Sequence, residues 1–177
     1  AQGHPLPFEN VDDLRTSIAR DGHDAELDAA LDHIEGIDYE GDEVIAHQRE
    51  GALAINDLVA EFAEKGMSEN RQLIAMVLVR LHDLTVRDYA MGITSEENID
   101  TLWTMWRWLL RLAPDGYVAP VATLFAVTSY ERGDGAMAQR ALERAFDDDS
   151  KYGLARLLRR SFAAGWPPSS FSSMRAE

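Results

Sequence analysis

Residues 119–166 read APVATLFAVTSYERGDGAMAQRALERAFDDDSKYGLARLLRRSFAAGW, and this stretch decides the fold. It holds three segments with apolar side chains at helical spacing, and Gly133-Asp134-Gly135 forms the turn between the first two. Small side chains stand where two packed helices approach each other closely: Ala122, Ala126, Ala138 and Ala145. The pattern is typical of a helical hairpin followed by a third helix. It is not typical of a catalytic site.

The segments upstream have the same helical periodicity. A first helix is expected to begin at Asn10 or Asp12 and to end before Gly22. Further helices are expected over residues 24–34, 42–65, 68–90 and 95–112. No segment is left for a strand. We therefore predict an all-α fold of about eight helices, arranged as antiparallel hairpins with short connections.

Two local signals refine this prediction. Thr94 and Glu97 have the spacing of a capping box, which would open the helix over residues 95–112. Gly51 interrupts the helix over residues 42–65 at a cost of about 1 kcal/mol relative to alanine. A glycine inside a helix is expected where another element crosses closely.

The length of 177 residues suits a single domain with its own hydrophobic core. We predict one helical domain over residues 1–177, with an extended lead-in over residues 1–10 and a disordered tail over residues 169–177. The sequence has no cysteine, which fits a reducing compartment. It also lacks a run of about 18 apolar residues and a signal-peptide pattern. We therefore expect no membrane association and a cytoplasmic protein.

The charge is strongly acidic and unevenly distributed. Residues 1–66 carry 17 acidic and 4 basic side chains, whereas residues 132–177 carry 6 acidic and 8 basic ones. The formal net charge of −14 repels phosphate backbones, so we expect no nucleic-acid binding. The arginines near the C-terminal end suggest regulatory nucleic-acid binding as an alternative: Arg156, Arg159 and Arg160. Their other interpretation is stabilisation of a helix C-terminus.

The helix over residues 95–112 is the most apolar and is predicted to be central to the core. It carries Trp103, Trp106 and Trp108. These three and Trp166, which follows the last helix, are our candidate partner-binding residues. For the first three the alternative is a role in the core. For Trp166 the alternative is that it holds the chain end against the body.

A search for chemistry finds no nucleophile elbow, phosphate loop or Glu-x-x-His pair, and we predict no cofactor. One metal site remains conceivable if two helix faces meet, with five ligand candidates: Glu43, His47, Glu50, His82 and Asp83. The alternative for these residues is a solvated helix flank. The acidic run Asp147-Asp148-Asp149 at a helix C-terminus marks either a loop start or a cation or arginine partner.

Two resemblances follow from these motifs. Residues 119–152 resemble a single tetratricopeptide repeat, with Ala126, Ala138 and Ala145 at its small positions. No second copy occurs upstream, so the hairpin is expected to pack on the tryptophan-rich helix before it. More specifically, residues 102–168 are similar to the C-terminal half of an actinobacterial family of domains of unknown function, number 4192. The motifs that carry this similarity are LWxxWRWL, the Pro-Asp-Gly turn, R-G-D-G-A, A-L-E-R-A, Y-G-L-A-R-L-L and A-G-W-P-P.

The resemblance implies no catalytic residue and suggests that the chain is the C-terminal half of a longer protein. We therefore expect a non-enzymatic helical domain that binds a protein partner or serves as a scaffold. The alternative is a metal-dependent enzyme, or the accessory half of one, built on the five ligand candidates.

Overall fold

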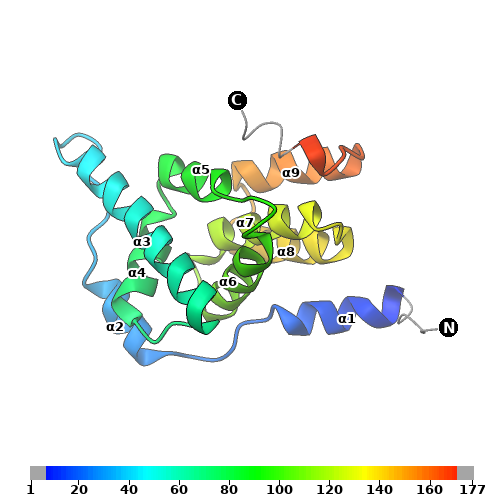
Figure 1. Ribbon diagram of the computed structural model, residues 1–177, viewed down its shortest axis with the longest axis horizontal. Helices are drawn as coiled ribbons and strands as arrows, with labels where there is room; N and C mark the ends of the chain where they lie inside the picture. The colour runs from blue at the N-terminus through cyan, green and yellow to red at the C-terminus, as the bar shows by residue number, and fades with distance from the viewer. Residues whose placement is uncertain (1–6, 171–177) are drawn as a thin grey trace.

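The computed structural model describes the backbone of residues 7–170 and the side chains of residues 11–170. Within these residues every regular element is a helix, which confirms the predicted fold class. The helices are α1 (Pro7–Ser17), α2 (Ala25–Asp32), α3 (Val44–Lys65), α4 (Arg71–Arg80), α5 (Leu84–Gly92), α6 (Ile99–Leu112), α7 (Val118–Glu131), α8 (Gly135–Asp148) and α9 (Gly153–Ala163). Figure 1 shows α2–α4 on one side of the molecule and α1, α8 and α9 on the other.

Helix α7 forms the centre of the fold. Every residue from Val118 to Ser129 is buried, because α5, α6, α8 and α9 all contact it. The tryptophan-rich helix α6 belongs to the core, as predicted, because it buries Leu102, Met105, Trp106, Leu109 and Leu110. Its other face is less covered, since Arg107 and Trp108 are only half-buried.

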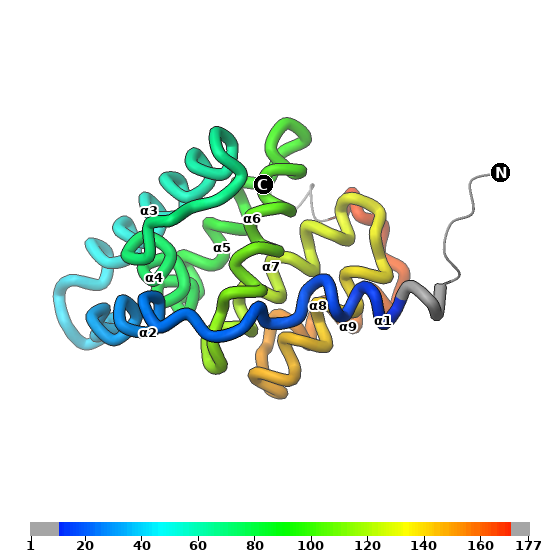
Figure 2. Tube along the Cα trace, turned by 90° about the horizontal axis from the view of Figure 1, so that it is seen from below, coloured from blue at the N-terminus to red at the C-terminus, as the bar shows by residue number. Residues whose placement is uncertain are grey.

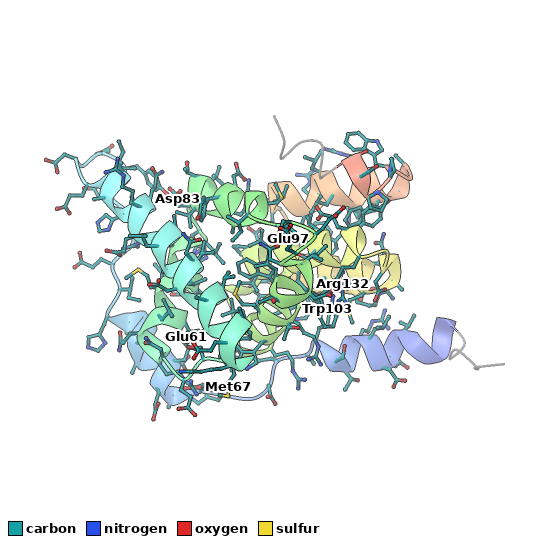
Figure 3. All side chains as sticks on the ribbon, viewed as in Figure 1. Glu61, Met67, Asp83, Glu97, Trp103 and Arg132 are labelled. Atoms are coloured by element: carbon teal, nitrogen blue, oxygen red, sulfur yellow. The ribbon has the colours of Figure 1, made fainter. Side chains whose placement is uncertain are left out.

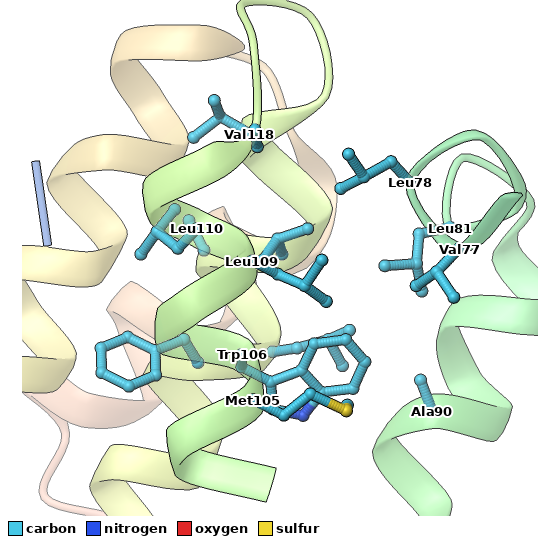
Figure 4. Close-up of a cluster of buried hydrophobic side chains, with 14 of the residues drawn as sticks. Val77, Leu78, Leu81, Ala90, Met105, Trp106, Leu109, Leu110 and Val118 are labelled. Atoms are coloured by element: carbon cyan, nitrogen blue, oxygen red, sulfur yellow. The ribbon is translucent and has the colours of Figure 1, made fainter. Parts of the chain in front are cut away.

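A continuous apolar core joins α4, α5, α6 and α7 (Figure 4). Trp106 of α6 is its largest side chain and is 1% exposed. In Figure 4 it lies beside Met105 and faces the side chains that α4 and α5 contribute. Burying an aromatic side chain of this size stabilises the fold by about 3 kcal/mol.

The α7–α8 hairpin is closed by a carboxylate. Asp148, at the end of α8, accepts hydrogen bonds from three backbone N–H groups where α7 begins: Gly116 (2.6 Å), Val118 (3.1 Å) and Ala119 (2.9 Å). These N–H groups have no partner within their own helix, and the positive end of the helix dipole also favours the carboxylate. Within the acidic run at residues 147–149, Asp148 therefore caps the neighbouring helix α7.

Helix α1 lies far from α2 and packs against α8 instead (Figures 1 and 2). The guanidinium of Arg15 contacts Glu143 at 3.1 Å. The segment between α1 and α2 crosses the end of α6, where the amide of Asp21 donates to the carbonyl of Arg111. Arg144 donates to the carbonyl of Ile18 from the other side. The N-terminal and C-terminal regions are therefore held together directly.

The predicted helix over residues 68–90 is two helices. Helix α4 ends at Arg80, and the side chain of Asp83 caps α5 by accepting from the amide of Val86 at 2.9 Å. An aspartate at this position favours a new helix start. The apolar periodicity on both sides obscured that signal.

Three predicted boundaries also change. Helix α1 begins at Pro7, so the extended lead-in over residues 1–10 was wrong from residue 7 onward; proline is well suited to a first helical turn. Ser95 and Asn98, rather than Thr94 and Glu97, form the reciprocal hydrogen bonds before α6. Residues 169–170 are helical, and the rest of the predicted tail lies outside the described residues.

Gly51 is confirmed as the site of a close helix crossing. A Cβ atom at this position would lie 2.8 Å from the Cβ of Arg80 and 3.0 Å from the methyl groups of Val86. Helix α3 therefore packs with its backbone against the junction of α4 and α5. This contact sets the position of α3 in the region that contains the candidate site.

Candidate functional site

The surface between α3 and α4 is open. A pocket of about 560 Å³ lies there, which we call the α3–α4 groove. Its lining residues are Ala46, Arg49, Glu50, Leu53, Ala54, Asp57, Leu73 and Met76. The Leu53 side chain, on the α3 wall, is 62% exposed. The groove therefore offers apolar side chains to solvent between charged neighbours.

The periodicity of α3 explains why this surface is left uncovered. Ile55, Leu58 and Phe62 form its buried face. The residues at 46, 50, 53 and 57 follow the same helical spacing but are rotated from that face, so they form a second stripe along the helix. No helix of the described chain covers this second stripe, and all four of its residues are exposed.

The second wall is positioned by the turn between the two helices. Gly66 ends α3 with a φ of 71°, a left-handed conformation that favours glycine. Asn70 then caps α4 by accepting from the amide of Leu73 at 3.0 Å. Helix α4 consequently runs back beside α3 and places Leu73 and Met76 on the groove.

The buried guanidinium of Arg80 lies beneath one end of the groove and fixes the side chains of α3 there. Arg80 of α4 is 3% exposed and donates to the Glu35 carbonyl (2.8 Å), to a carboxylate oxygen of Glu50 (3.2 Å) and to Nδ1 of His47 (3.1 Å). Because a guanidinium only donates, Nδ1 of His47 is an acceptor and its proton is on Nε2. Glu50, which lines the groove, is thus fixed by a charged hydrogen bond.

Asp83 fixes the loop before α3 in a similar way. Its carboxylate is 4% exposed and accepts from the Tyr39 hydroxyl (2.6 Å), the Gln48 amide (3.1 Å) and the Val86 N–H (2.9 Å). Burial alone would raise the pKa of this carboxyl, but these donors outweigh it and lower the pKa. The hydrogen bond to Asp83 raises the pKa of Tyr39 to about 12.

The five predicted metal-ligand candidates are not brought to one centre. His47 and Glu50 share Arg80, Glu43 lies 3.7 Å from His47, and the Asp83 carboxylate is occupied as described above. His82 belongs to another contact, in which its Nε2 lies 2.8 Å from the carbonyl oxygen of Gly116. Among residues 11–170 no three His, Asp or Glu side chains are placed to hold a metal ion.

The four candidate tryptophans do not share one surface either. Trp106 belongs to the core, whereas Trp108 packs edge-on against Phe62 at a centroid distance of 5.2 Å. Trp103 is half-buried and lies near Arg132 (Figure 3). Trp166 is 46% exposed, and its carbonyl accepts a hydrogen bond from the Tyr130 hydroxyl. Its backbone therefore holds the chain end while its ring faces solvent.

Trp103 is fully engaged within the fold. Its indole N–H donates to the Ser129 hydroxyl at 3.1 Å, and the Arg132 guanidinium lies 4.6 Å from its ring centroid. Arg132 is held in turn by Asp100 at 3.1 Å. A cation–π contact of this kind contributes about 0.5–1 kcal/mol at a surface. Trp103 thus connects α6 to the end of α7.

Two smaller pockets flank the Asp148 cap. They measure about 310 Å³ and 270 Å³ and share Gly116 and Asp148 in their linings. The polar groups in them already serve the fold, since Asp148 caps α7 and Arg144 donates to the carbonyls of Ile18 and Leu110. Partial desolvation lowers the pKa of His82, which is in contact with Tyr117. The α3–α4 groove is larger and more apolar, so it is the stronger candidate site.

Sequence reasoning missed the groove. The available signal was Leu53, a large apolar residue of α3 that lies outside the face formed by Ile55 and Leu58. The composition of residues 42–65 alone does not reveal which stripe is covered, because that depends on where α2 and α4 pack.

Within the described residues no helix is long and apolar enough to cross a membrane. No curated protein and no solved structure matches the chain. A family model described as "Domain of unknown function (DUF4192)" matches residues 5–169. This match extends the similarity that residues 102–168 carry to nearly the whole sequence. The chain belongs to the family of domains of unknown function number 4192.

Proposed function

We propose that this domain binds a protein partner and receives a segment of that partner in the α3–α4 groove. The observation that carries the proposal is the exposure of Leu53 inside a groove whose walls are held rigidly from behind by Arg80 and Gly51. Helical pairs with an open apolar groove are a common way to bind peptide segments. The metal-dependent alternative gains no support, because its five residues are not brought together at one centre.

The composition of the chain supports further parts of the proposal. A net charge of −14 disfavours nucleic acid as the partner. The lack of cysteine is compatible with a cytoplasmic location. The excess of arginine over lysine and the family resemblance support an actinobacterial source.

The proposal is tested by placing a photo-crosslinking amino acid at position 53 of the full-length protein. Leu157 of α9, which is 45% exposed on another surface, provides the matched control position. We expect a reproducible crosslinked partner from position 53 and none from position 157. Equal crosslinking from both positions, or none from position 53, would contradict the proposal.

A further inference from the structure

The chain around the groove carries an excess of negative charge. Residues 24–80, which include both walls of the groove, carry 14 acidic and 4 basic side chains, and Arg71 of α4 is paired with Asp24. Of the acidic residues on α3, Glu50 is paired with Arg80. Asp57, Glu61 and Glu64 form no ion pair with any described residue of the chain. Arg49 and Lys65 are the basic residues of α3, so an occupant of the groove meets a net excess of negative charge along this helix.

The groove has the dimensions of a short helix. The stripe from Ala46 to Asp57 covers about 17 Å of α3 at 1.5 Å per residue, or about three helical turns. Apolar side chains of both walls face the opening: Ala46, Leu53, Leu73 and Met76. Such a surface accepts a helix that presents apolar anchors three and four residues apart.

We infer that the occupant is a cationic amphipathic helix of a partner protein, with about three turns and lysine or arginine beside its apolar stripe. The inference rests on the proposed function and specifies its partner. Opposite charges attract over about 10 Å at moderate ionic strength and accelerate the encounter, while the apolar contacts hold the complex. A second copy of the acidic α3–α4 surface would instead be repelled.

Synthetic peptides test the inference on the full chain. The probe is a labelled helical peptide with a leucine stripe flanked by lysines, and binding is followed by fluorescence anisotropy. One comparison peptide keeps the leucine stripe and replaces every lysine by glutamate. A second keeps the lysine-rich composition in a scrambled order without a stripe. We expect only the cationic amphipathic peptide to bind, with affinity that falls about tenfold when the ionic strength rises from low to high.

Matched variants locate the binding site. Leu53→Glu should weaken binding at least about tenfold, whereas Leu157→Glu on α9 should not change it. Asp57→Lys with Glu64→Lys should also weaken binding. The pair Glu96→Lys and Glu97→Lys makes the same change in net charge away from the groove and should have little effect; in Figure 3, Glu97 lies well apart from Glu61 of α3. Equal effects of the two lysine pairs would show that only net charge matters and would overturn the inference.

The remaining outcomes separate the inference from the proposed function. If the acidic peptide binds as well as the cationic one and Leu53→Glu abolishes both, the charge inference is overturned while the groove stays the binding site. If no peptide binds but position 53 still crosslinks a partner, the inference fails and the proposed function stands. Concentration-dependent self-association that is lost in both Leu53→Glu and Arg156→Glu would assign the groove to α9 of a second copy. That result would also overturn the inference.

Discussion

The molecule contains two helical hairpins that are built alike but differ in how much of their surface is buried. In both hairpins, α3–α4 and α7–α8, a left-handed glycine lies in the turn after the first helix: Gly66, with a φ of 71°, caps α3, and Gly133, with a φ of 84°, follows the cap of α7. Helix α7 is buried on all sides, whereas α3 is covered on one side and open on the other. The closed hairpin serves the stability of the domain. The open hairpin leaves apolar side chains exposed to solvent. An exposed apolar surface of this kind is typical of an interaction site.

The two hairpins should differ most in how much stability is lost when one large apolar side chain is replaced by alanine. Phe125→Ala in α7 removes a fully buried ring that packs against Trp103, and we expect it to lower the free energy of unfolding by about 3–5 kcal/mol. Leu53→Ala in α3 removes an exposed side chain and should cost about 0.5 kcal/mol or less. Chemical denaturation of both variants measures the contrast. Similar losses would show that the groove is part of the core.

A second change tests how rigidly the open hairpin is anchored. Gly51→Val adds atoms where the Cβ alone would approach within 2.8 Å of Arg80, so we expect a loss of about 3 kcal/mol in the free energy of unfolding. Gly92→Val is the control, since nothing lies within 4 Å of a Cβ at that position. Thermal and denaturant unfolding should separate the two variants. A Gly51→Val protein as stable as the control would rule out the close crossing.

A third change opens the closed hairpin. Asp148→Ala removes the acceptor for three N–H groups at the start of α7, and we expect a loss of about 2 kcal/mol. Its neighbour Asp147 is exposed and makes no such cap, so Asp147→Ala should be nearly neutral. The two variants can be compared by urea denaturation. Equal stability would contradict the role given to Asp148.

The smallest effect concerns pH and the loop beside the groove. Because the pKa of Asp83 is lowered in the folded state, its stabilisation is fully present above the unfolded value of 3.8 and is lost as pH falls through the folded pKa. Asp83→Asn should cost about 1–2 kcal/mol at neutral pH, and the difference from wild type should shrink in acid. Asp32→Asn, at an exposed position, is the control and should leave the free energy of unfolding at neutral pH nearly unchanged. Denaturation at several pH values is the measurement; a constant difference would disprove the assignment.

The sequence predicted the helical class and the α7–α8 hairpin because small and apolar residues repeat there at clear helical spacing. It missed the break between α4 and α5, since Asp83 is a single polar residue within a long apolar pattern. The backbone groups that Asp148 caps could not be predicted either, because Gly116 and Ala119 are about 30 positions away in the chain. The four tryptophans were predicted to bind a partner, yet Trp103, Trp106 and Trp108 pack against other side chains of the domain. The groove depends on which stripe of α3 its neighbours cover, which is a tertiary property.

The most direct test of the interaction surface uses the methionine methyl groups. Met76 lines the groove, whereas Met105 and Met137 are buried in α6 and α8. In a spectrum of protein labelled at methionine methyls, addition of the cationic amphipathic peptide should shift the Met76 signal and leave those of Met105 and Met137 in place. A bound peptide that shifts Met137 and leaves Met76 unchanged would contradict the assignment of the α3–α4 groove as the binding surface.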